Sequence, residues 1–368
     1  MKLGTVVCLL VAVSASAQDK PALSEQAFKN VRALKGIPVD EFMATMGFFS
    51  ASLGETCTDC HSAESGGSWE KYADDNPRKN TARAMIGMMN AINKTYFGGK
   101  REITCYSCHR GVERPDVTPN LADLYGPPPS KEPDELRQPI GKAIPAEQIL
   151  DKYILAMGGA ENLAKLTSFA AKGTYQGYQD DKFPVDVFVK APNQLSSVIH
   201  TAAGDSATTY DGREGWIAGP ATERPVALLP LTDGDLNGVK LDAALWFPTQ
   251  IKQALTQWRA ATSVTIDGRE MQMIQGTTDG RYPVNLYFDS KTGLLARLVR
   301  YSESPVGLNP TQIDYADYRE VAGVRKPYRV TVTWLDGRAT TEFTEIQPNA
   351  PVEAARFAKP VPAARQNQ

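Results

Sequence analysis

The residues best suited to chemistry in this chain form two copies of one five-residue motif. The first is Cys-Thr-Asp-Cys-His at residues 57–61, and the second is Cys-Tyr-Ser-Cys-His at residues 105–109. Two cysteines three positions apart lie on the same side of one helical turn, where their sulfurs can join the two vinyl groups of a porphyrin. The histidine that follows directly then faces the iron. Each motif therefore predicts one covalently attached haem c. The attachment residues are Cys57, Cys60, Cys105 and Cys108, and the iron ligands are His61 and His109.

Paired cysteines also occur in three other kinds of site. A zinc site uses Cys-x-x-Cys twice, and a thioredoxin-like redox site uses it once. In an exported protein, two local disulfides are a further alternative. None of these sites needs a histidine directly after the second cysteine. The chain has five cysteines and three histidines, and four of the cysteines and two of the histidines fall in the two motifs. This concentration favours haem.

Nine methionines in the chain are candidates for the sixth ligand of each iron. A methionine in this position raises the reduction potential and closes the iron to oxygen. A helix is predicted over residues 40–53, ending at Gly54, and it carries Met46 on its apolar stripe. A second helix is predicted over residues 81–97, just before the second motif. It carries three methionines, Met85, Met88 and Met89. Each methionine is also a natural core residue, because methionine fills irregular gaps.

Three stretches around the motifs carry a family resemblance. They are Met-Gly-Phe-Phe-Ser-Ala-Ser-Leu-Gly-Glu-Thr-Cys at 46–57, Thr-Ala-Arg-Ala-Met-Ile-Gly-Met-Met-Asn-Ala-Ile-Asn at 81–93, and Ile-Thr-Cys-Tyr-Ser-Cys-His-Arg-Gly at 103–111. With them, residues 34–115 resemble the photosynthetic reaction centre cytochrome c subunit family. In that family each haem unit is a helix with the distal methionine, a turn, and a helix with the attachment motif.

The resemblance implies Met46 and Met85 as the distal ligands, and it does not favour Met43, Met88 or Met89. It also implies a haem-binding fold and electron transfer. The best-known members bind four haems, whereas this chain has two motifs. The expected role is therefore that of an electron carrier between envelope redox proteins, with a photosynthetic reaction centre as one candidate acceptor.

The first 17 residues are predicted to be an export signal. Lys2 supplies the positive end, residues 6–13 form a short apolar run, and small residues at 15–17 precede the expected cleavage site. A retained anchor helix is the alternative, but the run is shorter than the ~20 apolar residues that span a bilayer. The mature protein is expected in the periplasm or elsewhere outside the cytoplasm.

A proline-rich stretch divides the rest of the chain. Eight of the 25 prolines lie between residues 115 and 145, and such a stretch forms a semi-rigid spacer. The predicted organisation is α+β. It comprises a small, mostly helical two-haem domain (18–114), the linker (115–145), an antiparallel β-rich domain (146–360) and a tail (361–368).

The β-rich domain is predicted from runs of β-branched and apolar residues separated by turns. Examples are residues 185–190, 284–288 and 329–334, with hairpin turns at 289–293 and 336–338. One or two helices are expected, at 146–157 and 239–255. The architecture resembles the open-barrel fold of periplasmic lipoprotein or lipid carriers, so an apolar ligand in this domain is one candidate. His200, the remaining histidine, is expected to be a packed or surface residue.

Three classes of function follow from these features. The leading prediction is an electron carrier, not an enzyme, with two His/Met haems and protein redox partners, some of them membrane-bound. A two-haem peroxidase would instead need an open sixth position on one iron. A carrier or sensor would bind an apolar ligand in the β-rich domain. The formal net charge of −2 and the pI near 6.0 give no sign of a nucleic-acid surface.

Overall fold

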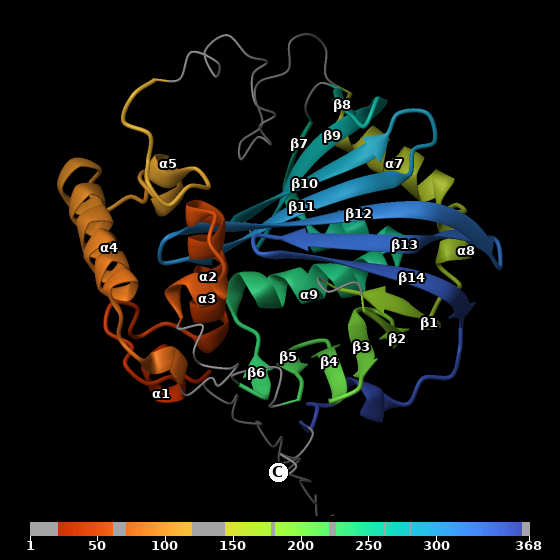
Figure 1. Cartoon of the computed structure of the whole chain (residues 1–368). Helices are drawn as coiled ribbons and strands as arrows, with labels where there is room; N and C mark the ends of the chain where they lie inside the picture. The colour runs from red at the N-terminus through yellow and green to blue at the C-terminus, as the bar shows by residue number, and fades with distance from the viewer. Residues whose placement is uncertain are drawn as a thin grey trace, which may run out of the picture.

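The computed structural model describes residues 21–61, 71–119, 144–177, 181–220, 226–260, 263–279 and 281–362. The predicted signal peptide, most of the proline-rich linker and most of the tail lie outside these residues. The described chain consists of a helical region (residues 21–119) beside a large antiparallel sheet with its own helices (the sheet domain, residues 144–362), as Figure 1 shows. The predicted α+β class is confirmed.

The helical region is built around two long helices. Its elements are α1 (Ser24–Ala27), α2 (Val39–Leu53), α3 (Cys57–Cys60), the 3-10 turn η2 (Lys71–Ala73), α4 (Pro77–Tyr96) and α5 (Cys105–His109). Helix α2 ends where predicted, with Gly54 in the left-handed conformation at φ +68°. Helix α4 begins one turn earlier than predicted. Asn76 caps it by accepting a hydrogen bond from the Lys79 backbone N–H at 3.0 Å, and Pro77 occupies the first helical position.

Fourteen described strands form one sheet in which all neighbours are antiparallel. The first half of the strands is β1 (Ser168–Gln176), β2 (Lys182–Lys190), β3 (Gln194–Thr201), β4 (Gly204–Tyr210), β5 (Gly215–Ala218), β6 (Leu228–Pro230) and β7 (Thr256–Ala260). The second half is β8 (Val264–Ile266), β9 (Arg269–Thr278), β10 (Tyr282–Asp289), β11 (Leu295–Ser304), β12 (Gly307–Val321), β13 (Val324–Trp334) and β14 (Gly337–Pro348). The order is β6-β5-β4-β3-β2-β1-β14-β13-β12-β11-β10-β9-β7, with β8 paired to β9.

The sheet domain also contains helices. They are α7 (Ala146–Ala156), α8 (Ala160–Leu163), α9 (Asp233–Leu245), α10 (Ile251–Ala254) and the 3-10 turns η3 (Pro248–Gln250) and η4 (Ala354–Phe357). Helix α9 lies in the hollow of the curved sheet (Figure 1) and contacts β3, β4 and β11. Its Val239, Leu241 and Ala243 belong to the main core. The helix predicted over residues 239–255 is interrupted, because Pro248 starts a separate 3-10 turn.

The predicted hairpin turns are confirmed. Between β10 and β11, the Asp289 carboxylate accepts hydrogen bonds from the backbone N–H groups of Lys291 (3.1 Å) and Thr292 (2.8 Å). Strands β13 and β14 are joined at Leu335 and Asp336. Both turns place polar groups at the ends of strands whose other faces pack in the core.

Contacts join the helical region to the sheet domain along α2. At the start of this helix, the buried Asp40 carboxylate accepts hydrogen bonds from the Thr232 backbone N–H (2.5 Å) and hydroxyl (2.7 Å). Further along, Phe48 packs with Val306, which lies in the turn between β11 and β12. This hairpin reaches α2 in Figure 1.

None of the helices in the described residues combines the length and the apolar character that a bilayer crossing requires.

Candidate haem-binding site

The first motif forms a single capped helical turn. Its helix α3 runs from Cys57 to Cys60, and His61 is the residue directly after it. Thr56 caps the turn, because its backbone N–H donates to the Asp59 carboxylate at 2.7 Å. The cap fixes the two cysteines at positions i and i+3 of one turn, which is the spacing that attachment to a porphyrin needs.

The second motif repeats this geometry. Helix α5 contains Cys105, Cys108 and His109, and its cap is Thr104, whose backbone N–H donates to the Ser107 hydroxyl at 3.0 Å. None of the four motif cysteines forms a disulfide within the described residues. Cys57 and Cys108 are exposed, and Cys60 and Cys105 are partly buried. Burial raises the pKa of both partly buried thiols.

Both motif histidines use the same ring nitrogen, Nδ1, for a hydrogen bond to a backbone carbonyl. The Nδ1 atom of His61 lies 3.0 Å from the Tyr72 carbonyl oxygen, and that of His109 lies 3.1 Å from the Val112 carbonyl oxygen. A carbonyl only accepts, so Nδ1 carries the proton in each neutral ring, and the lone pair of Nε2 is left for a metal. Hydrogen bonding of the second ring nitrogen to a carbonyl is the usual arrangement of a metal-ligating histidine.

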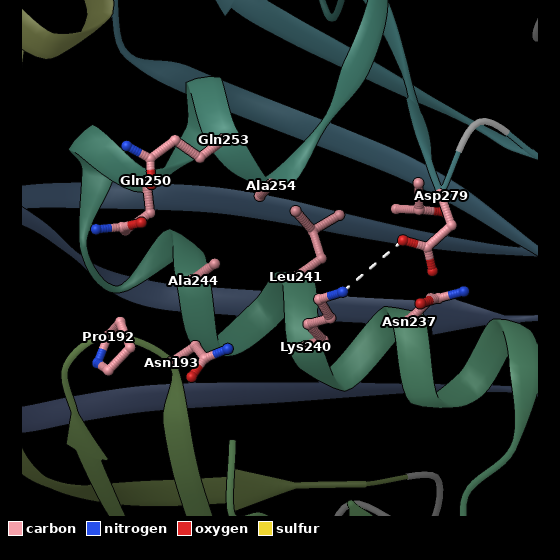
Figure 2. Close-up of a pocket in the computed structure, with 11 residues that line it drawn as sticks. Pro192, Asn193, Asn237, Lys240, Leu241, Ala244, Gln250, Gln253, Ala254 and Asp279 are labelled. Atoms are coloured by element: carbon pink, nitrogen blue, oxygen red, sulfur yellow. Dashed lines mark ion pairs between the residues drawn. The ribbon is translucent and has the colours of Figure 1, made fainter. Parts of the chain in front are cut away.

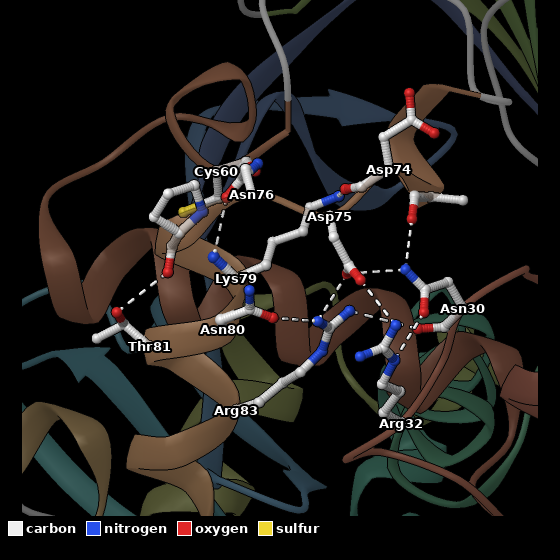
Figure 3. A network of polar contacts seen from close by, with 12 residues as sticks. Asn30, Arg32, Cys60, Asp74, Asp75, Asn76, Lys79, Asn80, Thr81 and Arg83 are labelled. Atoms are coloured by element: carbon white, nitrogen blue, oxygen red, sulfur yellow. Dashed lines mark hydrogen bonds and ion pairs between the residues drawn. The ribbon is translucent and has the colours of Figure 1, made fainter.

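Polar contacts from within the helical region hold the first motif (Figure 3). The Asn76 side chain donates to the Cys60 carbonyl at 2.7 Å. The Lys79 ammonium donates to the Tyr72 carbonyl at 2.6 Å, which is the carbonyl that also accepts from His61. The ring of Tyr72 stacks on that of His61 with centroids 4.6 Å apart. The histidine ring is therefore fixed by both a hydrogen bond and a stacking contact.

A second layer of charges connects α4 to the start of the helical region. Asp75 accepts from Arg83 and from Arg32 at 2.7 Å each, and from the Asn30 side chain at 2.8 Å, as Figure 3 shows. Hydrogen bonds from Arg83 and Asn30 lower the pKa of Asp75. This network holds the start of α4 beside the loop that precedes α2.

The segments that flank the two motifs are joined through α2 and Arg78. The backbone N–H of Gly111, just after the second motif, donates to the Ser52 carbonyl at 2.9 Å, near the end of α2. The Arg78 guanidinium lies 3.1 Å from the carboxylate of Glu55, ahead of the first motif, and 3.6 Å from that of Glu113, after the second. Helix α2 also contacts α5. The two attachment turns thus share one small framework.

The methionines separate into core and surface residues. Met89 is 4% exposed and packs with Phe48 and Val306, so it has the core role that methionine often takes. On the same helix, Met85 is 40% exposed and Met88 is 48% exposed. Met46 is partly buried on α2. The assignment of Met46 and Met85 as distal ligands stays a prediction.

Several large apolar side chains near the motifs in sequence are exposed. Besides Met85 and Met88, they include Phe97, Tyr106 and Val112, close to the second motif in sequence. Paired thiols, a histidine Nε2 and uncovered apolar side chains together suit haem c.

A metal ion bound by side chains alone would need at least three ligands close together. Within the described ranges, no three His, Cys, Asp or Glu side chains are grouped in this way. The two cysteine pairs therefore do not meet at one point in this part of the chain.

Sequence reasoning missed the residues that support the motifs. Asn76 had a detectable signal, because an asparagine directly before a proline is a typical helix start. Tyr72 and Arg78 had none, since their roles depend on contacts across the fold.

The sheet domain has a small pocket lined by both apolar and polar residues (Figure 2). It measures about 140 Å³, and Leu241 and Ala244 of α9 line it together with four carboxamide side chains, those of Asn193, Asn237, Gln250 and Gln253. Lys240 and Asp279 form an ion pair across its edge at 3.8 Å. The apolar ligand expected for this domain stays a prediction.

His200 is a surface residue, as expected. It lies between two carboxylates, with Nδ1 2.8 Å from Asp205 and Nε2 3.3 Å from Asp186. The hydrogen bond with Asp205, followed by that with Asp186, raises the pKa of His200.

Comparison with known proteins addresses the helical region. Residues 7–122 match the family model of the photosynthetic reaction centre cytochrome C subunit. The resemblance to this cytochrome family is confirmed. The photosynthetic reaction center cytochrome c subunit of Thermochromatium tepidum is 34% identical over 92 residues. That match covers 24% of this chain and 22% of the relative, so the chain corresponds to less than a quarter of the relative's length.

Comparison with solved structures gives matches that cover somewhat more than half of the chain at low sequence identity. A LolA superfamily protein from Nitrosomonas europaea is 17% identical, with a TM-score of 0.40, covering 59% of this chain and 99% of that one. A putative outer membrane lipoprotein-sorting protein domain from Vibrio parahaemolyticus is 9% identical, with a TM-score of 0.40, covering 57% and 97%. A DUF1329 family protein from Desulfovibrio piger is 10% identical, with a TM-score of 0.41, covering 58% and 97%.

Proposed function

We propose that the chain is an exported c-type cytochrome that carries two covalent haems and transfers electrons between redox proteins. The observation that carries the proposal is the repeated histidine geometry. In both motifs Nδ1 donates to a backbone carbonyl and Nε2 is left for iron, beside two thiols on one helical turn. The match to a cytochrome family over residues 7–122 supports the same class of function.

Each residue of the site has a defined task in this proposal. Cys57 and Cys60 would hold one haem through thioethers, and Cys105 and Cys108 the other. His61 and His109 would bind the irons, and Met46 and Met85 would be the second protein ligands of the irons. When bound, the haems supply reversible one-electron oxidation and reduction. The chain itself orients the histidine rings through the Nδ1 hydrogen bonds and, at His61, through the stacking of Tyr72.

Transfer between the two sites is supported by their common framework. The end of α2 contacts the residue that follows the second motif, and Arg78 lies between carboxylates that flank the two motifs. Electron exchange between two haems needs the two centres to be close to each other and held in fixed positions. The proposal therefore includes electron exchange between the two haems within one small domain.

The cellular setting is part of the proposal. Export by the predicted signal peptide would place the protein in the periplasm, where haem c carriers meet membrane-bound and soluble redox partners. A photosynthetic reaction centre is one candidate acceptor, because the relative from Thermochromatium tepidum is named as a cytochrome c subunit of such a centre. With methionine on both irons, the role is that of a carrier and not of an enzyme.

The proposal is tested by the mass of the denatured protein purified from a host that matures cytochromes c. We expect the processed chain plus two haems. The double variant Cys105→Ser/Cys108→Ser should retain one haem, and Cys57→Ser/Cys60→Ser should retain the other. A mass equal to the bare polypeptide contradicts the proposal. A redox titration followed by absorbance should then show two one-electron steps.

A further inference from the structure

The two attachment motifs have different surroundings. The first is held by polar contacts from Asn76, Lys79 and Tyr72, all within the helical region. The second lies beside an apolar cluster of Phe48, Met89 and Val306, against which Cys105 packs. Val306 belongs to the sheet domain, so this cluster contains residues from both parts of the protein. The environment of the second motif is therefore shared with the sheet domain.

Two turns of the sheet domain build this contact. In the turn between β11 and β12, Val306 is completely buried, and the turn is closed by the Ser304 hydroxyl, which donates to the Gly307 carbonyl at 2.9 Å. In the turn between β13 and β14, Leu335 packs against the same cluster. Both turns reach the helical region in the view of Figure 1.

The fit between these turns and α2 is close. A Cβ atom on Gly307 would come within 2.3 Å of the Phe48 ring, so this position tolerates only glycine while Phe48 stays in place. A Cβ atom on Gly47 would come within 3.3 Å of the Asp336 carboxylate, so the Asp336 side chain would have to shift slightly to accept it. The contact is thus shaped by complementary residues on both sides.

Hydrogen bonds and backbone contacts extend this contact to both ends of α2. At its start, Asp40 accepts two hydrogen bonds from Thr232 of the sheet domain. At its end, the Ser52 carbonyl accepts from the N–H of Gly111, two residues after the second motif. Helix α2 therefore contacts the sheet domain at its start and middle, and it contacts the segment after the second motif at its end.

We propose that the sheet domain sets the reduction potential of the second haem by burying the apolar cluster around Cys105. The inference rests on the proposed attachment of a haem at this motif. An apolar shell that excludes water disfavours the more highly charged, oxidised state of an iron site and raises its potential. Val306 and Leu335 are positioning residues in this proposal, since they act through Phe48, Met89 and Cys105.

The test uses the full-length protein with both haems attached. Val306→Ser places a hydroxyl in the dry cluster, and Leu335→Ser is a milder change at its edge. The matched control is Leu308→Ser, because Leu308 lies two residues from Val306 and is 39% exposed. The titration step that disappears in Cys105→Ser/Cys108→Ser is assigned to the second haem. Amide hydrogen exchange over residues 103–112 provides a readout that does not involve electron transfer.

We expect Val306→Ser to favour oxidation of the second haem by three- to tenfold, which lowers its potential by about 30–60 mV at 59 mV per tenfold change. Leu335→Ser should act in the same direction, and the first haem and the Leu308→Ser protein should be unchanged. In both Val306→Ser and Leu335→Ser, faster amide exchange over residues 103–112 should accompany the lower potential of the second haem.

Two results overturn the inference while leaving the proposed function intact. One is two attached haems whose potentials are unaltered in both Val306→Ser and Leu335→Ser. The other is an equal shift of both haems, which would indicate a general loss of stability. Absence of covalent haem in the unmodified protein would instead contradict the proposed function itself.

Discussion

The backbone of Gly54, at the end of α2, lies directly against the carbonyl of Gly111. A Cβ atom on Gly54 would come within 2.3 Å of that oxygen. Gly54 is three residues ahead of the first attachment cysteine, and Gly111 is two residues after the second histidine. This contact joins the segments that flank the two motifs, and it depends on a residue without a side chain.

Substitution of Gly54 by alanine should destabilise the protein. The residue has φ +68°, and the added methyl group would overlap with the Gly111 carbonyl. Backbone strain of this type costs about 1–3 kcal/mol, and the overlap should add to it. The control is Gly98→Ala, because Gly98 has φ +62° and no atom within 4 Å of the added Cβ. Urea unfolding should show a clearly larger loss for Gly54→Ala, and equal losses would show that the Gly111 contact is unimportant.

The distal ligands can be tested one methionine at a time. Met46→Ala and Met85→Ala should each leave both haems attached, remove one sulfur–iron charge-transfer band, lower one potential and allow carbon monoxide to bind. Met88→Ala is the matched control on the same helix, since Met88 is exposed to a similar extent as Met85. A normal spectrum in Met85→Ala together with an altered one in Met88→Ala would transfer the ligand role to Met88.

Asn76 should contribute to stability through two separable hydrogen bonds. Its carbonyl oxygen accepts from the Lys79 N–H, and its amide donates to the Cys60 carbonyl. Asn76→Asp keeps the helix cap but loses the donor, so we expect a loss of about 1 kcal/mol. Asn76→Ala loses both bonds, and the missing cap should raise the loss to about 2 kcal/mol. Urea titrations of the two variants give the comparison. Wild-type stability of Asn76→Asp would mean that the bond to Cys60 contributes nothing.

Lys326 predicts a pH-dependent stability for the sheet domain. It is 2% exposed, its ammonium donates to the Trp246 carbonyl after α9, and it lies 4.1 Å from the centre of the Phe169 ring. Burial lowers the pKa of Lys326 from 10.5 to about 7. The unfolded chain therefore binds more protons than the folded protein between about pH 7 and pH 10.4, and stability should rise with pH across this window.

Replacement of Lys326 by methionine should flatten that rise, because the group that titrates differently in the two states is gone. The free energy of unfolding from urea titrations at pH 7, 8 and 9 gives the measurement, and each unit of pKa difference corresponds to about 1.4 kcal/mol. Lys182→Met, at an exposed position of β2, is the control and should keep the slope. A slope that survives in Lys326→Met would assign the pH dependence to other groups.

The fold was largely predictable where the signals are local. Gly54 marks the end of α2, and Gly158 follows the end of α7 by two residues. The turn residues after Asp289 and before Gly337 mark the two hairpins. Helix α4 starts at Pro77 and not at residue 81, and Asn76 and Pro77 carry the signature of that helix start. The predicted helix over residues 239–255 was continuous, whereas Pro248 divides it.

The sequence by itself determined the two Cys-x-x-Cys-His motifs for which haem attachment is predicted, because the geometry of this motif is contained within one or two helical turns. The tertiary structure decided what surrounds them. It placed Met89 in the core and Met85 and Met88 at the surface of one helix, it joined Gly54 to Gly111, and it brought Val306 against Phe48. These relationships involve residues from distant parts of the chain. No local pattern encodes them, because they arise only when the sheet and the helices pack and water is excluded between them.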